Sequence, residues 1–208
     1  MTRIPEAERL EQLAAIDRTY WETPGTVLAG MDEVGRGPLA GPVVVACAVM
    51  PPSPLVQYVN DSKKLSEKRR EKVYRELADT ALAHATAWVS PDTIDEINIL
   101  EATKRAVAEA FRGIGLPVTD VLIDALRGLD IDARQHSLIH GDALSYSIAA
   151  ASIIAKVERD RYMIEQDALY PMYGFARNKG YGTAEHIAAL RRYGPCPLHR
   201  RSFLKNFL

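Results

Sequence analysis

GMDEVGRGPLAGP, residues 30–42, is the stretch that decides how this chain folds and what chemistry it can carry. Its adjacent acids, Asp32 and Glu33, follow TVLAGM (residues 26–31), which has the composition of a short strand. The Gly-Arg-Gly turn behind them lets backbone N–H groups approach a ligand closely. Adjacent carboxylates at a strand end are costly to bury and readily explained as cation ligands, although an ordinary surface loop can have the same sequence.

The sequence on either side alternates strand-like and helical patterns. Strands are predicted at 26–31, 42–50, 84–90, 118–126 and around 135–139. Helices are predicted at 5–22, 66–83, 91–111 with a break near Asn98, 143–167 and 183–192. This mixture predicts an α/β fold with a mixed central sheet of about five strands, flanked by helices and followed by a C-terminal helical region. We expect a helical extension at 1–25 and a catalytic domain at 26–208.

Two further acids end or precede predicted elements. Asp124 closes the apolar run VLID, and Asp142 stands just before the long helical segment. Each has a structural alternative, because Asp can cap a turn and is a favoured helix N-cap. Together with Asp32 and Glu33, however, they would supply the hard oxygen ligands that a divalent cation needs.

The charge of the chain is balanced overall but uneven along its length. The 208 residues carry 26 basic and 27 acidic side chains, for a formal net charge of -1. This balance argues against a simple basic coat for nucleic acid. Seven lysines and arginines nevertheless lie within residues 177–208, after an acidic stretch at 120–142. An acidic metal site beside a phosphate-binding surface would explain this order, and solvated faces are the alternative.

Cysteine content and hydropathy restrict the class of protein. The two cysteines, Cys47 and Cys196, predict no disulfide framework. Cys196 and His199 have a C-x-x-H spacing, but two ligands do not make a structural zinc site. No apolar run approaches the length of a membrane span, and the charged N-terminal segment is not a signal peptide. We expect a cytoplasmic protein that does not bind membranes and is monomeric.

The motifs, taken in order, resemble ribonuclease HII, the type 2 ribonuclease H family. The matching blocks are DEVGRGPLAGP (32–42), DSKKLSEKRRE (61–71), NILEATKRAV (98–107), VLID (121–124), GDALSYSIAAASIIAKVERDR (141–161), KGYGTAEH (179–186) and HRRSF (199–203). The resemblance implies a ribonuclease H-like fold and Mg²⁺ or Mn²⁺ as cofactor. It also implies two substrates, RNA–DNA hybrids and duplex DNA that contains single ribonucleotides.

The resemblance also implies roles for individual residues. The catalytic, metal-binding acids are Asp32, Glu33, Asp124 and Asp142. Residues expected to contact the substrate are Gly35, Arg36 and Gly37 at the ribose 2′-hydroxyl, Tyr181 against the next nucleotide, and Lys63 and Lys64 at a phosphate. On spacing alone, Tyr181 could equally close the core. Two positions depart from the family pattern: Ala125 stands where Gly is expected, and Asn178 where many members have His.

Three alternatives make different demands on the sequence. The type 3 ribonuclease H shares the fold but usually carries a sizeable N-terminal substrate-binding domain, whereas about 28 residues precede the first motif here. A non-catalytic nucleic-acid-binding module on this fold would typically lack one or more of the four acids. A magnesium phosphatase would leave the basic C-terminal stretch unexplained. The intact acid set therefore favours a nuclease.

Overall fold

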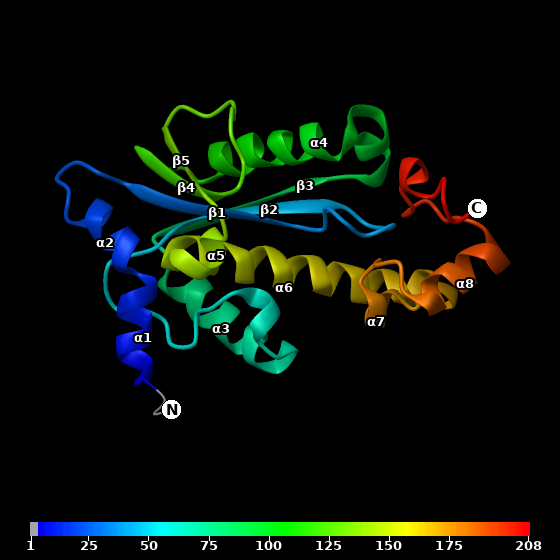
Figure 1. Cartoon of the computed structure of the whole chain (residues 1–208), viewed down its shortest axis with the longest axis horizontal. Coiled ribbons are helices and arrows are strands. Elements are labelled where there is room, and N and C mark those ends of the chain that lie inside the picture. Colours follow the sequence, from blue (N-terminus) through cyan, green and yellow to red (C-terminus); the bar gives the residue numbers. More distant parts are fainter. Residues whose placement is uncertain (1–3) are drawn as a thin grey trace.

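A computed structural model describes residues 4–208, which form a layered α/β structure (Figure 1). The sheet of this region consists of β1 (Leu28–Val34), β2 (Val43–Val49), β3 (Ala83–Val89), β4 (Asp120–Asp124) and β5 (Arg134–Leu138). Their order is β3-β2-β1-β4-β5, with β1 antiparallel to β2 and parallel to β4. The outer pairs are β2 with β3, antiparallel, and β4 with β5, parallel. This mixed sheet confirms the predicted fold class.

Helices cover both faces of the sheet. They are α1 (Glu6–Leu13), α2 (Ala15–Trp21), α3 (Glu67–Thr80), α4 (Pro91–Gly113), α5 (Gly141–Leu144), α6 (Tyr146–Leu169), α7 (Phe175–Asn178) and α8 (Ala184–Tyr193), with 3₁₀ turns η1 (Ser62–Lys64), η2 (Pro171–Tyr173) and η3 (Arg201–Phe203). Figure 1 shows α4 on one face and α6 with α3 on the other, while α7 and α8 lie beyond one end of the sheet. The expected break in α4 is confirmed, because Asn98 has φ 67°.

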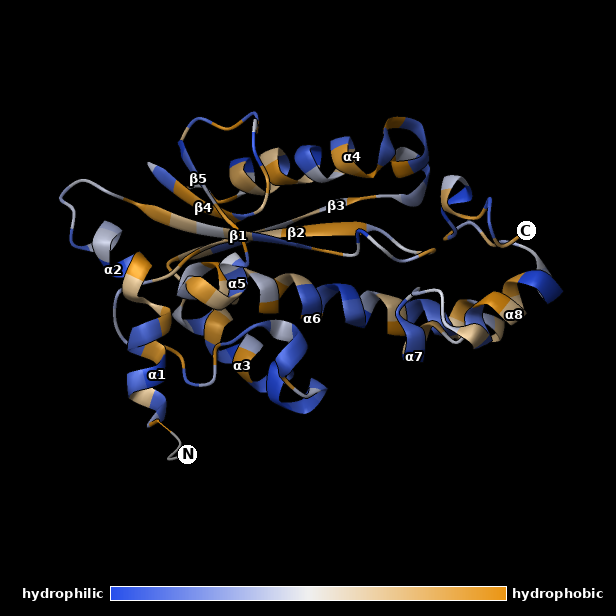
Figure 2. Ribbon diagram, in the orientation of Figure 1, coloured by the Kyte–Doolittle hydropathy of each residue, from blue (hydrophilic) through white to orange (hydrophobic). Residues whose placement is uncertain are grey.

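The two-residue alternation of the strands divides the core into two layers. Met31 and Val45 pack with Ala106 of α4 on one face, whereas Ala46 and Ile153 of α6 belong to the cluster on the other. Figure 2 shows β2 as hydrophobic and α3 as mainly hydrophilic, as expected for a buried strand and an outer helix. No helix within residues 4–208 is long and apolar enough to cross a membrane.

The structure corrects three predicted boundaries. The first helix is divided at Ala14 into α1 and α2. The first strand continues to Val34, so Asp32 and Glu33 lie within it instead of following it. The segment predicted as one helix from 143 is two helices, α5 and α6, with Ser145 between them. Ser145 caps α6 by accepting a hydrogen bond from the Ile148 N–H at 3.2 Å.

The N-terminal helices attach to the start of α6 through a buried acid. Asp17 of α2 is fully buried and accepts hydrogen bonds from the Ser145 hydroxyl and from the backbone N–H groups of Tyr146 and Ser147, at 2.9–3.1 Å. These N–H groups belong to the first turn of α6, where a carboxylate is favoured electrostatically. The N-terminal extension therefore packs against the body of the fold.

Candidate active site

Asp32 and Asp124 lie on neighbouring strands and share a face of the sheet. Met31 of β1 is opposite Ile123 of β4, and each acid is the next residue along its strand. Leu28 and Leu122, an even number of residues earlier, pack together against α6. Strand alternation therefore directs both acids towards the layer that contains α5 and α6.

Close helix packing makes that shared face compact. A Cβ at Gly30 would lie 2.1 Å from the Ser147 carbonyl carbon, so α6 approaches β1 as closely as the backbone allows. The N–H of Gly141, the first residue of α5, donates to Asp124 Oδ1 at 3.1 Å. Gly141 is followed at once by Asp142, so the same contact brings Asp142 to the strand ends.

The structure does not support an N-cap role for Asp142. Asp142 lies inside α5, and the residue before this helix, His140, makes no side-chain cap. The long helix α6 is capped by Ser145. Asp142 is nevertheless buried. A buried acid that satisfies no helix terminus requires another explanation, such as ligand binding.

The charges of the four acids affect one another's pKa values. Burial raises the pKa of Asp32 well above its usual value, and the charges of Glu33 and Asp142 raise it further. Burial raises the pKa of Glu33, with a contribution from Asp124. Burial also raises the pKa of Asp142, assisted by Asp61 and Asp124. Carboxylates that repel one another in a desolvated site are strongly stabilised by a cation.

Three of the acids have other partners in this conformation. Glu33 Oε1 lies 3.3 Å from Arg36 Nη1, Asp124 accepts from Gly141, and Asp142 Oδ2 lies 4.0 Å from Lys63 Nζ. In this conformation, no group of three His, Cys, Asp or Glu side chains within residues 4–208 is arranged to bind a metal ion. The donor set still fits Mg²⁺ or Mn²⁺, because Glu33 Oε2 is buried without a hydrogen-bond partner and all four groups are hard oxygen donors.

Two buried arginines hold the Gly-Arg-Gly loop from behind. Arg200 is fully buried and donates to the carbonyl oxygens of Gly35, Arg36 and Gly41. Arg159 of α6, also fully buried, donates to the carbonyls of Pro42, Ala40 and Lys179, at 2.9–3.1 Å. A Cβ at Gly35, which has φ +91°, would lie 2.3 Å from Arg159 Nε. Gly35 is therefore required by this clamp, whatever its contact with substrate.

Sequence reasoning missed the arginine clamp and misplaced Arg200. Arg200 is one of the seven basic residues within 177–208, the stretch that could form a phosphate-binding surface, but it is buried and binds backbone carbonyls. Burial, and then the charge of Arg159, lower the pKa of Arg200 to about 9. Its neighbour Arg201 is exposed. The sequence HRR gives no sign of which arginine turns inward, because that depends on the return of the chain to residues 35–41.

Tyr181 stands beside the loop with its side chain partly in solvent. It is 44% exposed, which excludes the alternative that it closes the core. Its ring lies 3.9 Å from where a Cβ of Gly37 would be. Gly180 packs on the loop backbone, because its carbonyl accepts from the Leu39 N–H at 2.8 Å and a Cβ on it would clash with the Ala40 oxygen.

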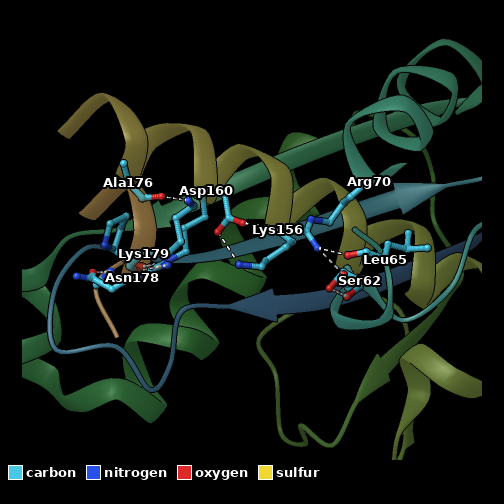
Figure 3. Close-up of polar contacts among 12 residues, drawn as sticks. Ser62, Leu65, Arg70, Lys156, Asp160, Ala176, Asn178 and Lys179 are labelled. Carbon is cyan, nitrogen blue, oxygen red and sulfur yellow. Dashed lines mark hydrogen bonds and ion pairs between the residues drawn. The ribbon is translucent and has the colours of Figure 1, made fainter. Parts of the chain in front are cut away.

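Lys63 and Lys64 are presented at the edge of the acidic site by η1. Partial burial opposes the charged form of Lys63, but Asp142 and Asp61 outweigh this effect and raise its pKa. Arg70 anchors the turn by donating to the Ser62 and Leu65 carbonyls, at 2.7 and 2.9 Å (Figure 3). In the same view Asp160 accepts from Lys156 at 2.6 Å, and its other carboxylate oxygen lies 3.5 Å from Arg70.

The two departures from the family pattern have local explanations. Ala125 has φ +48°, a left-handed conformation in which Gly is favoured. Asn178 uses both ends of its amide, donating to the Tyr173 carbonyl and accepting from the Gly180 N–H, at 2.7 and 2.8 Å. Asn178 thus supports the turn before Tyr181, and neither departure alters the four acids.

Comparison with known proteins shows the family of the chain. The family model described as Ribonuclease HII matches residues 29–206. The chain belongs to this family. A Ribonuclease HII of Ruminiclostridium cellulolyticum is 49% identical over 203 residues, which cover 98% of this chain and 80% of that protein. The family assignment makes the chain a type 2 ribonuclease H, an endoribonuclease that hydrolyses the RNA strand of RNA–DNA hybrids.

Solved structures agree with the fold. The ribonuclease H2 of Pyrococcus horikoshii OT3 superposes with a TM-score of 0.72 at 28% identity, covering 84% of this chain and 92% of that chain. Bst-RNase HIII in complex with Mn²⁺ superposes with a TM-score of 0.60 at 21% identity, covering 97% of this chain and 71% of that chain, and it shows the fold alone. The family assignment removes the non-catalytic alternative and the magnesium phosphatase.

Proposed function

We propose that this enzyme, besides cutting RNA in hybrids, incises duplex DNA on the 5′ side of single embedded ribonucleotides. We also propose that two divalent ions, Mg²⁺ or Mn²⁺, are bound by four acids: Asp32, Glu33, Asp124 and Asp142. The observation that carries the proposal is the mutual electrostatic effect of these four acids, of which Asp32 and Asp142 are buried. They stand next to the Gly35–Gly37 loop, in which the Gly35 and Arg36 carbonyls accept hydrogen bonds from Arg200.

The loop and Tyr181 divide the recognition of substrate between them. Arg200 holds the Gly35 and Arg36 carbonyls, and this fixes the loop. The N–H groups of the loop would then donate to the 2′-hydroxyl and nearby phosphates. A site built to donate to that hydroxyl rejects deoxyribose by leaving donors unpaired. The exposed ring of Tyr181 beside Gly37 packs on the sugar of the next nucleotide, where a 2′-oxygen would be crowded.

The four acids orient the reacting groups. When bound, two divalent ions would activate a water molecule and stabilise the leaving 3′-oxygen. Asp32 is buried on β1, the strand between β2 and β4, and the contact of Gly141 with Asp124 holds Asp124 next to Asp142. Lys63 and Lys64 neutralise the phosphate next to the cut. The products are a 3′-hydroxyl and a 5′-phosphate.

A panel of labelled duplexes tests this proposal. Duplexes with zero, one or four consecutive ribonucleotides, and a full RNA–DNA hybrid, are incubated with enzyme and Mg²⁺ or Mn²⁺. We expect no cutting of pure DNA, one cut 5′ of the single ribonucleotide and several cuts in the hybrid. Cutting of the hybrid alone would contradict single-ribonucleotide incision while leaving the family activity in place.

A further inference from the structure

Two buried imidazoles form a hydrogen-bonded pair behind Tyr181. His186 of α8 and His199, near the C-terminus, are 0% and 2% exposed, and their Nε2 atoms lie 3.0 Å apart. The rings of Tyr173 and Phe175 enclose them, with the Tyr173 ring centroid 4.8 Å from that of His199. A pair this deeply buried must have matched donors and acceptors, because an unpaired nitrogen would carry a desolvation cost.

The two ends of the pair fix where its protons are. The Cys196 backbone N–H donates to His199 Nδ1 at 3.0 Å, so this nitrogen is an acceptor and the proton of neutral His199 is on Nε2. At the other end, His186 Nδ1 lies 2.9 Å from the Tyr181 carbonyl oxygen, which can only accept. His186 therefore carries its proton on Nδ1 and offers the Nε2 lone pair to His199. Both ends therefore require the same direction of hydrogen-bond donation, from Cys196 through His199 and His186 to Tyr181.

This chain of hydrogen bonds ends on the residue that flanks the loop. The Tyr181 carbonyl accepts from His186 and also from the Thr183 N–H at 2.8 Å, so its peptide plane is held from two sides. The backbone of His199 forms an isolated β-bridge with Ala40, three residues after Gly37. The pair thus links the backbone segment that is bridged to Ala40 with the backbone that carries the Tyr181 ring.

We propose that His186 and His199 are positioning residues, whose neutral hydrogen-bonded pair sets the place of the Tyr181 ring and so the preference for DNA after the ribonucleotide. This inference rests on the proposed function, in which Tyr181 packs on that sugar. Neither imidazole touches substrate; both act through the Tyr181 backbone.

Protonation breaks the pair, because each neutral ring has only one lone pair and it is already accepting. A proton on His186 Nε2 would face the His199 N–H, and one on His199 Nδ1 would face the Cys196 N–H. The surroundings oppose charge: they are the Cys196 thiol and the Tyr173 and Phe175 rings. The nearest charged residues along the chain are Glu185, which pairs with Arg177, and the buried Arg200. Burial lowers both pKa values, that of His199 to about 4 with the help of His186.

The test combines nuclear magnetic resonance with substrate preference. Nitrogen-15 spectra of the imidazoles at neutral pH should show a Nδ1–H tautomer for His186 and a Nε2–H tautomer for His199; the opposite tautomers would overturn the proposal. His186→Ala should lower the ratio of single-ribonucleotide incision to hybrid cleavage about tenfold. His186→Asn, whose amide nitrogen can replace Nδ1 as donor to the Tyr181 carbonyl, should restore the ratio. His84→Asn, at the far strand β3, is the matched control and should leave it unchanged.

Two readouts separate this proposal from others. A purely structural role predicts equal slowing of both substrates by His186→Ala, and that result would refute positioning. The Tyr181 ring signals should shift in His186→Ala and return in His186→Asn; unchanged signals in both would also refute it. If wild-type enzyme does not incise single ribonucleotides, the proposed function fails, and the tautomers and the Tyr181 signals still decide the positioning claim. If His186→Ala does not fold, the nitrogen-15 spectra of the wild-type imidazoles, followed through an acid titration, test the proposed tautomers and the neutral state of the pair.

Discussion

Replacing Arg200 by Met tests whether a buried arginine, instead of an arginine on the DNA-binding surface, builds the substrate loop. Met is an unbranched side chain without donors, so the Gly35 and Gly41 carbonyl oxygens, whose bonds to Arg200 are buried, lose a partner. An unsatisfied buried carbonyl costs about 1–3 kcal/mol, or about 2–6 kcal/mol for two. Removing a desolvated charge offsets part of this cost. We expect the free energy of unfolding to fall by about 3 kcal/mol.

Urea unfolding, followed by circular dichroism, measures this loss, and the next residue provides the control. Arg201 is exposed, and its hydrogen bonds, from its backbone N–H to Asp95 and from the Leu204 N–H to its carbonyl, involve the backbone and not the side chain. Arg201→Met should change the unfolding free energy by less than about 0.5 kcal/mol. Equal, small losses in both variants would refute the clamp. If Arg200→Met reduced the salt dependence of nucleic-acid binding more than Arg201→Met does, Arg200 would be a phosphate contact after all.

Three further predictions follow from single residues. Ala125→Gly should stabilise the fold by up to about 1 kcal/mol in thermal unfolding, because Ala pays for a left-handed φ of +48°; destabilisation would contradict the assigned conformation. The stability advantage of wild type over His199→Gln should shrink by about 3 kcal/mol as pH falls from 6.5 towards 4, because the unfolded His199 takes up a proton that the folded one refuses; a constant difference would contradict a neutral His199. Tyr181→Ala should slow single-ribonucleotide incision about tenfold more than hybrid cleavage in single-turnover assays, with an unchanged melting temperature; equal slowing would contradict its role in recognition.

Local patterns predicted the elements of the fold but not all of their ends. The apolar strands and the break at Asn98 follow from periodicity and from the residues present. The extent of β1 does not, because Asp32 and Glu33 look like loop residues until β2 pairs with them through Val45 and Ala46. Strand pairing with a distant segment overrides local preference there.

The candidate site shows the same division. The four acids and the Gly-Arg-Gly turn are contiguous or sit at element ends, so sequence reasoning could select them. The arginine clamp and the His186–His199 pair depend on contacts across 13 to 165 residues of chain. No local signal marks a buried arginine or histidine, because the partners are backbone carbonyls and a second imidazole that only the fold brings near. Asp142 was ambiguous as a possible N-cap until Ser145 was seen to cap α6.

The measurement that tests the central claim most directly is single-turnover incision by Asp142→Asn at one ribonucleotide embedded in duplex DNA. Asp142 caps no helix, so its amide should leave the unfolding free energy within about 0.5 kcal/mol of wild type. As a metal ligand it should be indispensable, because a neutral amide is a much weaker donor. We expect Asp142→Asn to lose most activity with Mg²⁺, while Asp130→Asn, an exposed acid paired with Arg112, cuts normally. Near-normal incision by Asp142→Asn would contradict the proposed metal site.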